Sequence, residues 1–235
     1  MSTLSDQIHA VLALDPAAPA IEFEKSWTSW GELAAIMAEI GALLDAAGLP
    51  AGTRVGVMMR NHVLTAATLL EVVASDRCIV TLNAQLPDER LASDISAQKV
   101  PVVIGLARDW ARGTVRAAVA ASGGLGIVLG ESGGRNAAFV AGLEKATGSD
   151  LDRTAPGIAI EMLSSGTTGT PKRVPLKATS FAQGIELIDD IPPAAELIVR
   201  LRREYVAACQ VPDMADVARI DVERLVEQAN HFKPD

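Results

Sequence analysis

The chain has 235 residues, of which 49% are hydrophobic and 21% are charged, as is typical of a soluble protein with a buried core. Its formal net charge of −8 argues against a nucleic-acid partner, because such a protein needs a basic surface for the phosphate backbone. The longest uncharged run, residues 117–130, is too short and too rich in glycine to span a membrane, and no signal peptide is evident, so we expect a cytoplasmic protein.

The two cysteines, Cys78 and Cys209, lie far apart in the sequence. They have neither the spacing of metal ligands nor that of a disulfide framework, which suits a reducing cytoplasm. Cys78 lies within an apolar run, so we expect it to be a small core side chain. No residue of the chain is predicted to ligate a metal ion.

Short apolar runs alternate with longer amphipathic segments between about residues 20 and 185. The clearest helix begins at Ser29, because Ser29 and Glu32 can each satisfy an unpaired backbone N–H group in a capping box. Apolar residues then recur at helical spacing until Gly48, which is expected to end the helix in a left-handed conformation. Trp27 and Trp30 flank the start of this helix, where we expect them to seal the edge of the core.

The remaining elements follow in the same alternation. Strands are predicted at residues 54–59, 78–82, 100–104, 126–129 and 158–163, with a short edge segment at 174–176. Further helices are predicted through residues 64–73 with His62 as a candidate cap, from Pro87 onward, and at about 137–145 and 178–187. Strands that are hydrophobic on both faces and separated by helices indicate an α/β fold with a mostly parallel sheet flanked by helices.

The pattern changes beyond about residue 190. Pro192 and Pro193 interrupt the chain, and the residues after them show helical stripes without a further strand. We therefore predict two parts: a domain of residues 1–189, and a helical tail of residues 190–235 whose origin is unassigned.

Residues 164–172, which follow the last predicted buried strand, read Ser-Ser-Gly-Thr-Thr-Gly-Thr-Pro-Lys. Glycines let the backbone approach a ligand, hydroxyls and inward-facing N–H groups can donate to phosphate oxygens, and the lysine supplies a mobile positive charge. We predict a loop that binds the phosphates of ATP, with the candidate residues Ser164, Ser165, Gly166, Thr167, Thr168, Gly169 and Lys172.

Three other interpretations of this segment fit its residues less well. A Walker A loop requires Gly immediately before Lys, whereas here Lys172 follows Pro171. An amidase-type serine nucleophile needs an upstream base lysine and more glycines around the serines. A flexible linker would not usually follow a buried strand and close with a Pro-Lys pair.

The segment resembles the phosphate-binding signature of the adenylate-forming enzymes: acyl-CoA synthetases, luciferases and the adenylation domains of peptide synthetases. Their pattern is Thr-Ser-Gly-Thr/Ser-Thr-Gly-x-Pro-Lys-Gly, and seven of its positions match between Ser165 and Lys172. Ser164 replaces the first Thr. Arg173 replaces the closing Gly, where it either restricts the loop or places a second cation beside it.

The resemblance extends to earlier parts of the chain. Residues 29–33 are similar to the family's Thr-Tyr-x-Glu-Leu helix start, and residues 52–57 to its Gly-Asp-x-Val strand entry. Residues 82–87 are similar to its Leu-Asn-Pro-x-x-Pro, with Ala84 in place of the first Pro. Agreement in order and spacing over about residues 20–185 implies the N-terminal portion of an acyl-CoA synthetase-like domain.

In the family's reaction a carboxylate attacks the α-phosphate of ATP, with Mg²⁺ as the cofactor, pyrophosphate leaves, and the acyl group passes to CoA or another thiol. We find neither the family's aromatic-Gly-x-Thr-Glu segment, nor its Thr-Gly-Asp, nor its catalytic Lys, so no catalytic residue is assigned. Two hypotheses follow. The chain is either a truncated ATP-dependent acid–thiol ligase, inactive alone, or a non-catalytic remnant or interaction module that binds nucleotide at most weakly and whose helical tail covers the open sheet edge. A protein partner is a further candidate for covering that edge.

Overall fold

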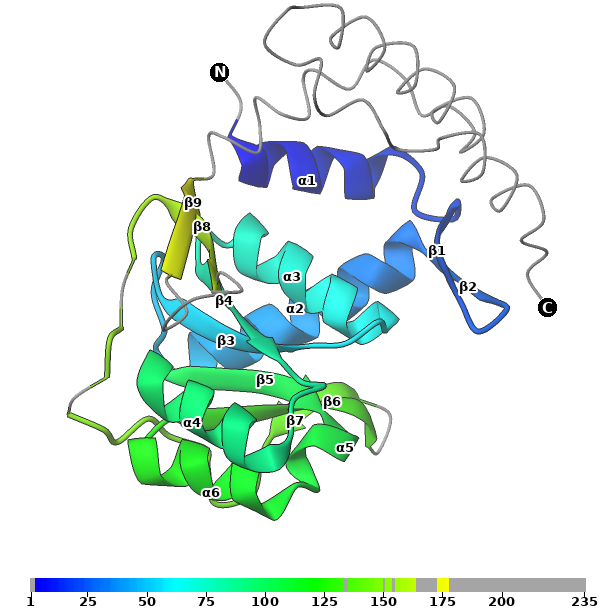
Figure 1. Ribbon diagram of the computed structural model, residues 1–235. Helices are drawn as coiled ribbons and strands as arrows, with labels where there is room; N and C mark the ends of the chain where they lie inside the picture. The colour runs from blue at the N-terminus through cyan, green and yellow to red at the C-terminus, as the bar shows by residue number, and fades with distance from the viewer. Residues whose placement is uncertain (1–2, 133–134, 150, 154, 164–172, 178–235) are drawn as a thin grey trace, which may run out of the picture. The chain divides into compact units, whose positions relative to one another are not determined.

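The computed structural model describes residues 3–132, 135–149, 151–153, 155–163 and 173–177, all of which belong to one unit of the chain, Met1–Gly184 (Figure 1). Its elements in chain order are α1 (Leu4–Leu14), β1 (Pro19–Phe23), β2 (Ser26–Ser29), α2 (Trp30–Ala46), β3 (Arg54–Met59), α3 (Val63–Ala74), β4 (Cys78–Asn83), α4 (Asp88–Gln98), β5 (Val102–Leu106), α5 (Ala107–Trp110), α6 (Gly113–Ser122), β6 (Leu125–Ser132), β7 (Arg135–Phe139), β8 (Ile158–Leu163) and β9 (Arg173–Lys177).

A seven-stranded sheet lies at the centre of the described residues, with the strand order β7-β6-β5-β3-β4-β8-β9. Strands β3, β4, β5, β6 and β8 are parallel, whereas β7 and β9 lie antiparallel at the two ends of the sheet. The predicted α/β fold with a mostly parallel sheet is therefore confirmed, and the segment predicted at residues 174–176 is the edge strand β9.

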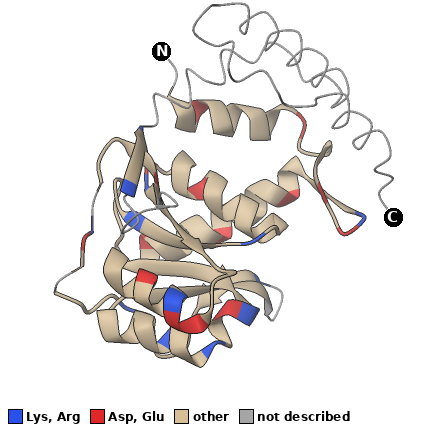
Figure 2. Cartoon of the chain, viewed as in Figure 1, with Lys and Arg blue, Asp and Glu red and all other residues tan. Residues whose placement is uncertain are grey.

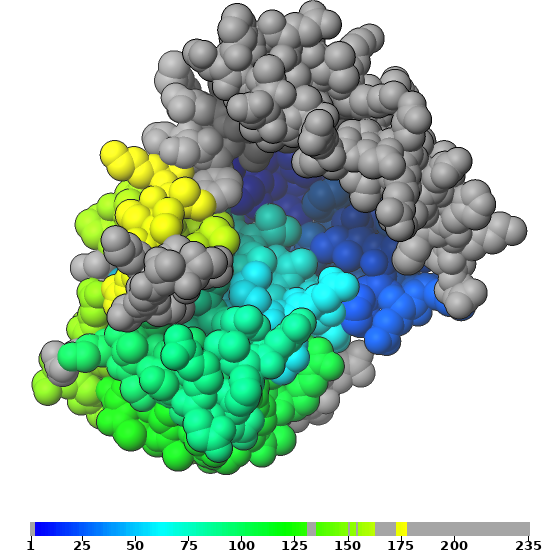
Figure 3. Space-filling view, viewed as in Figure 1, coloured from blue at the N-terminus to red at the C-terminus, as the bar shows by residue number. Residues whose placement is uncertain are grey.

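Helices cover both faces of this sheet, because its central strands carry apolar residues on both sides. Val55 and Val57 of β3 belong to a core that includes α2 and α3, whereas Met58 belongs to a second core with α4 and α6. Helices α1, α2 and α3 lie on the first face and α4 and α6 on the second (Figure 1). Figure 3 shows α4 and α6, coloured blue-green to green, as one continuous surface.

The local signals at the helix ends are confirmed. The Ser29 hydroxyl accepts the Glu32 N–H at 3.2 Å, and the Glu32 carboxylate accepts the Ser29 N–H at 2.8 Å, which is the predicted capping box. Gly48 has φ +67°, as expected of a left-handed residue after a helix. His62 caps α3, since its Nδ1 accepts the Leu64 N–H at 3.2 Å.

The prediction of a helix at residues 137–145 is wrong. Residues 135–139 form strand β7, which pairs antiparallel with β6, and Gly142 lies beyond it with φ +80°. Ala137, Val140 and Leu143 recur at a spacing of three, which imitates a helix, but all three are buried, Ala137 within β7 and the other two beyond it. Pairing with the otherwise open edge of β6 therefore overrides the local pattern.

Smaller features also differ from the sequence-based expectation. Helices α1, α5 and α6 and the two-stranded antiparallel sheet of β1 and β2 were not predicted. Trp27 lies in β2 and is 57% exposed, so it does not seal the core, whereas Trp30 is partly buried against the first core. Strand β5 begins at Val102 rather than residue 100, after Pro101, which lacks the N–H that a ladder needs.

Candidate functional site

The carboxyl ends of the parallel strands meet at one edge of the sheet, and a buried arginine–aspartate pair joins three of them. Arg60 directly follows β3 and donates to Asp109 Oδ1 from both Nε (3.1 Å) and Nη2 (2.7 Å). Asp109 has no exposed surface and also accepts the Leu106 N–H at the end of β5. Because Arg60 Nη2 donates to the Ala84 carbonyl beyond β4 as well, this pair fixes the ends of β3, β4 and β5 together.

The turn between β4 and α4 is held by a second arginine. Arg112 donates to the carbonyl oxygens of Ala84 (2.9 Å) and Leu86 (2.6 Å) and to Asp88 Oδ1 (2.8 Å). Acidic and basic positions are accordingly interleaved around the start of α4 (Figure 2). Ala84, where the resembling motif has Pro, thus accepts hydrogen bonds from two guanidinium groups that orient its carbonyl.

A cleft of about 720 Å³ opens at the same edge, beyond the ends of β3, β5 and β6. The chain leaves β3 toward β4 on one side and β5 lies on the other, so the cleft is at the topological switch point, where open α/β sheets commonly bind ligands. Its lining includes apolar residues of α2 and α3 and the polar residues Glu24, Thr28, Glu32, His62, Arg108 and Asn136.

His62 is the titratable group between the cleft and α3. The centroid of its ring lies 4.8 Å from the centroid of the Phe23 ring. Partial burial, and secondarily the charge of Arg108, lower the pKa of His62 below its ordinary value. This shift favours the neutral imidazole, which can accept the Leu64 N–H at the helix cap.

The seven candidate phosphate-binding residues of the sequence, Ser164 to Thr168, Gly169 and Lys172, lie outside the described residues. The structure describes the two strands on either side of them. Leu163 at the end of β8 pairs with Arg173 at the start of β9, so the two ends of segment 164–172 are neighbours in an antiparallel pair. The parallel pairing of β8 with β4 puts Leu163 toward the same carboxyl edge as the Arg60–Asp109 pair.

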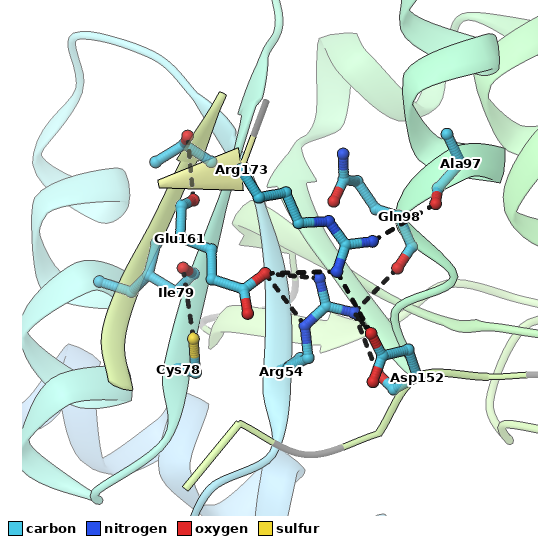
Figure 4. Close-up of polar contacts among 9 residues, drawn as sticks. Arg54, Cys78, Ile79, Ala97, Gln98, Asp152, Glu161 and Arg173 are labelled. Atoms are coloured by element: carbon cyan, nitrogen blue, oxygen red, sulfur yellow. Dashed lines mark hydrogen bonds and ion pairs between the residues drawn. The ribbon is translucent and has the colours of Figure 1, made fainter. Parts of the chain in front are cut away.

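A cluster of four charged side chains lies beside this strand pair and was not predicted from the sequence. Its members are Arg54, Asp152, Glu161 and Arg173. Arg54 is 1% exposed, and its Nη2 lies 2.6 Å from Glu161 Oε2 while its Nη1 lies 2.8 Å from Asp152 Oδ2. Nη1 also donates to the Gln98 carbonyl at the end of α4, at 2.9 Å. Figure 4 shows the Arg54 guanidinium between the two carboxylates.

The sequence does contain a signal for this cluster. Arg54 is the only charged residue of the apolar strand β3, and Glu161 is the only charged residue of the apolar strand β8. A single charge in such a strand needs a buried partner. Arg54 and Glu161 are each other's partner although they are 107 residues apart, and only the sheet order brings them together.

The side chain of Arg173 is directed to the acids of this cluster (Figure 4). Its Nη1 lies 3.2 Å from Asp152 Oδ2 and 3.6 Å from Glu161 Oε2, and its Nη2 lies 3.5 Å from the Ala97 carbonyl. The two sequence-based alternatives for Arg173, restriction of the loop or a second cation beside it, concern segment 164–172, which lies outside the described residues.

Neither a metal centre nor a reactive thiol is found among the residues that the structure describes. No group of three His, Cys, Asp or Glu side chains is placed to hold a metal ion there. Burial, reinforced by the charge of Glu161, raises the pKa of the Cys78 thiol to about 12, so it stays protonated and unreactive. None of the described helices is long and apolar enough to cross a membrane.

Comparison with known proteins identifies the relatives of this fold. The model of the AMP-binding enzyme family matches residues 9–214, and the match continues past residue 190, where we saw no resemblance in the sequence. The boundary at 189/190 thus remains a prediction. Among curated proteins, none matches the sequence.

Several solved structures have a similar fold. ATP-bound MatB from Rhodopseudomonas palustris is 26% identical, with a TM-score of 0.59 over 77% of this chain and 37% of that one. The anthranilate CoA ligase AuaEII in complex with anthranoyl-AMP is 17% identical, with a TM-score of 0.61 over 80% and 37%. A benzoate CoA ligase from Burkholderia xenovorans LB400 is also 17% identical, with a TM-score of 0.59 over 80% and 37%. The matched part thus spans about 37% of the length of each of these structures.

Proposed function

Because the chain belongs to the AMP-binding enzyme family, we propose that segment 164–172 binds the phosphates of ATP in an adenylate-forming ligase of the acid–thiol type. The observation that carries this proposal is the β8–β9 pair. It brackets the family's phosphate signature at the carboxyl edge of a parallel sheet, where α/β folds commonly bind ligands. The ATP-bound state of MatB, which is similar in fold, supports the choice of nucleotide.

Each residue of the segment has a proposed role. Gly166 and Gly169 allow close approach of the backbone, and the hydroxyls of the Ser and Thr residues donate to phosphate oxygens. Lys172 neutralises phosphate charge as a mobile ammonium group. Binding of this kind would lower the barrier to acyl-adenylate formation by positioning and by electrostatic stabilisation.

Mg²⁺ would enter with the nucleotide. This ion prefers a few carboxylates together with substrate phosphates and water to an all-protein cage. The described residues contain no cluster of three acidic, His or Cys side chains that could hold it. No residue of the described chain is therefore proposed as a magnesium ligand.

Turnover by these 235 residues is proposed to be negligible. The adenine-contacting segment, the ribose-binding Asp and the catalytic Lys expected from the family resemblance are not found in this sequence. The reaction with a carboxylic acid and CoA, or another thiol, is proposed for the complete site only.

Calorimetric titration with MgATP tests the binding proposal. We expect saturable binding that Lys172→Ala weakens at least about tenfold, since a charge-assisted contact to phosphate is lost. Lys177→Ala is the matched control, because it also removes one lysine charge. Lys177 lies at the far end of β9, where it pairs with Ile158, so this variant should bind MgATP like the wild type. Absence of ATP binding at millimolar concentration, or equal affinities of the two variants, contradicts the proposal.

A second candidate function is a non-catalytic module that binds a protein partner. It is favoured by the edge of the sheet, where Met162 and Val174 pair across β8 and β9 and are 47% and 43% exposed. Assay of ATP–pyrophosphate exchange with a panel of carboxylic acids tests the non-catalytic module. Exchange by this chain would exclude that module, whereas ATP binding without exchange is expected of either function.

A further inference from the structure

Strand β9 is poorly anchored by apolar contacts. Four of its five residues are exposed, and only Leu176 is intermediate. Pro175 stands in the middle of the strand opposite Glu161 and has no N–H to donate to the ladder. An edge strand of this kind gains little from burial, so its position depends on its hydrogen bonds to β8 and on its side-chain contacts.

Arg173 supplies the ion pairs of this strand among the described residues. It is the first residue of β9, and its guanidinium contacts Asp152, Glu161 and the Ala97 carbonyl at the end of α4. Cations near the last turn of a helix are stabilised by its unpaired carbonyls and its dipole. A single side chain thus links β9 to β8, to α4 and to the connection that contains Asp152.

The acceptors for Arg173 are fixed independently of it. Arg54 holds Glu161 at 2.6 Å and Asp152 at 2.8 Å and is itself oriented by the Gln98 carbonyl. Removal of Arg173 therefore leaves no buried acid without a partner. Arg173 is also 36% exposed, so its substitution is tolerated by the fold in a way that substitution of Arg54 is not.

We propose that Arg173 is a positioning residue for the proposed nucleotide site, because it ties the start of β9, which directly follows segment 164–172, to the Arg54–Glu161–Asp152 group. This contact is called the Arg173 tether below. The inference rests on the proposed function insofar as it concerns nucleotide affinity. The guanidinium already neutralises acids of the cluster, so it acts through the backbone of β9 rather than as a phosphate ligand.

Hydrogen exchange tests the tether without nucleotide. In the full chain, Arg173→Ala should accelerate exchange of the β9 amides about two- to fivefold, the range for a partly exposed ion pair. Lys177→Ala should leave exchange unchanged, and Arg173→Lys should restore part of the protection. In 1 M salt the wild type should approach Arg173→Ala, because exposed pairs are screened. Equal protection of wild type and Arg173→Ala at low salt would overturn the tether.

Nucleotide affinity then separates the tether from a direct phosphate contact. Asp152→Asn removes the negative charge that Arg173 and Arg54 share, so under the tether it weakens MgATP binding in the same direction as Arg173→Ala. If Arg173 instead reached the phosphates, Asp152→Asn would free its charge and strengthen binding, which would overturn the inference. A wild-type chain that binds no ATP would defeat the proposed function, while the exchange measurement would still decide whether the tether exists.

Discussion

The guanidinium of Arg54 and the carboxylate of Glu161 form a buried ion pair that spans β4, with Arg54 Nη2 2.6 Å and Nε 3.2 Å from Glu161 Oε2. The two residues are 107 positions apart, on the third and eighth strands of the chain. Through Asp152 and Arg173 the pair also reaches the connection before β8 and the strand after the predicted phosphate loop.

Substitution of Arg54 should destabilise the fold strongly. Arg54→Ala leaves Glu161 without its closest cation and leaves the Gln98 carbonyl without its donor from Arg54. Breaking a buried pair from one side costs about 3 kcal/mol, which equilibrium urea unfolding can measure. Arg90→Ala is the matched control, because Arg90, which pairs with Asp94 on α4, is 55% exposed, and it should cost below about 0.5 kcal/mol.

The double substitution Arg54→Met with Glu161→Met distinguishes pairing from packing. Replacing both charges by apolar side chains should recover most of the loss caused by Arg54→Ala, since no unpaired charge is then buried. If the double variant is as unstable as Arg54→Ala, the buried ion pair is not the cause of the effect.

Stability should depend on pH through Glu71. This residue of α3 is half-buried against Gly41 of α2, and burial raises its pKa from 4.5 to about 7, with Arg77 opposing and Asp45 reinforcing the shift. The folded state therefore retains a proton that the unfolded chain releases, and the contribution of Glu71 to stability falls as the pH rises from 4.5 to about 7.

Glu71→Gln removes this dependence. Relative to the wild type it should stabilise the protein at pH 8 by on the order of 1 kcal/mol, allowing for solvent screening at a partly exposed site, and have little effect at pH 4.5. Thermal or urea unfolding at both pH values provides the measurement. A stability difference that is the same at both values would rule out Glu71 as the titrating group.

Cys78 should resist alkylation in the folded protein. It is fully buried and its pKa is raised to about 12, so very little thiolate is present at pH 8. Peptide mass spectrometry after iodoacetamide treatment should find Cys78 modified at least about a hundredfold more slowly in the native chain than in urea. Comparable rates in the two conditions would contradict the burial of this thiol.

Local features of the fold could be predicted from the sequence because short-range chemistry determines them. The Ser29–Glu32 capping box, the left-handed Gly48 and the His62 cap each involve residues within a few positions of one another. The parallel sheet followed from apolar strands separated by helices. These signals concern backbone N–H groups and burial, which the residue types themselves reveal.

Several features that sequence reasoning missed depend on the sheet order, whereas the missed helix α1 and the β1–β2 pair are local. The apolar residues of 137–145 have helical spacing, but residues 135–139 pair with the edge of β6 and form a strand. The Arg54–Glu161 pair and the contacts of Arg173 require β3, β4, β8 and β9 to be neighbours, which no local pattern encodes. The seven candidate phosphate ligands lie outside the described residues, and their role stays a prediction.

Hydrogen exchange of peptides that cover residues 164–172, compared with and without MgATP, tests the central claim most directly. ATP should slow exchange in this segment, and adenosine at the same concentration should not, because the proposed contacts are to phosphate. Lys172→Ala should abolish most of the protection. Protection that is absent from this segment, or that is found instead around the cleft of His62 and Arg108, would contradict the account.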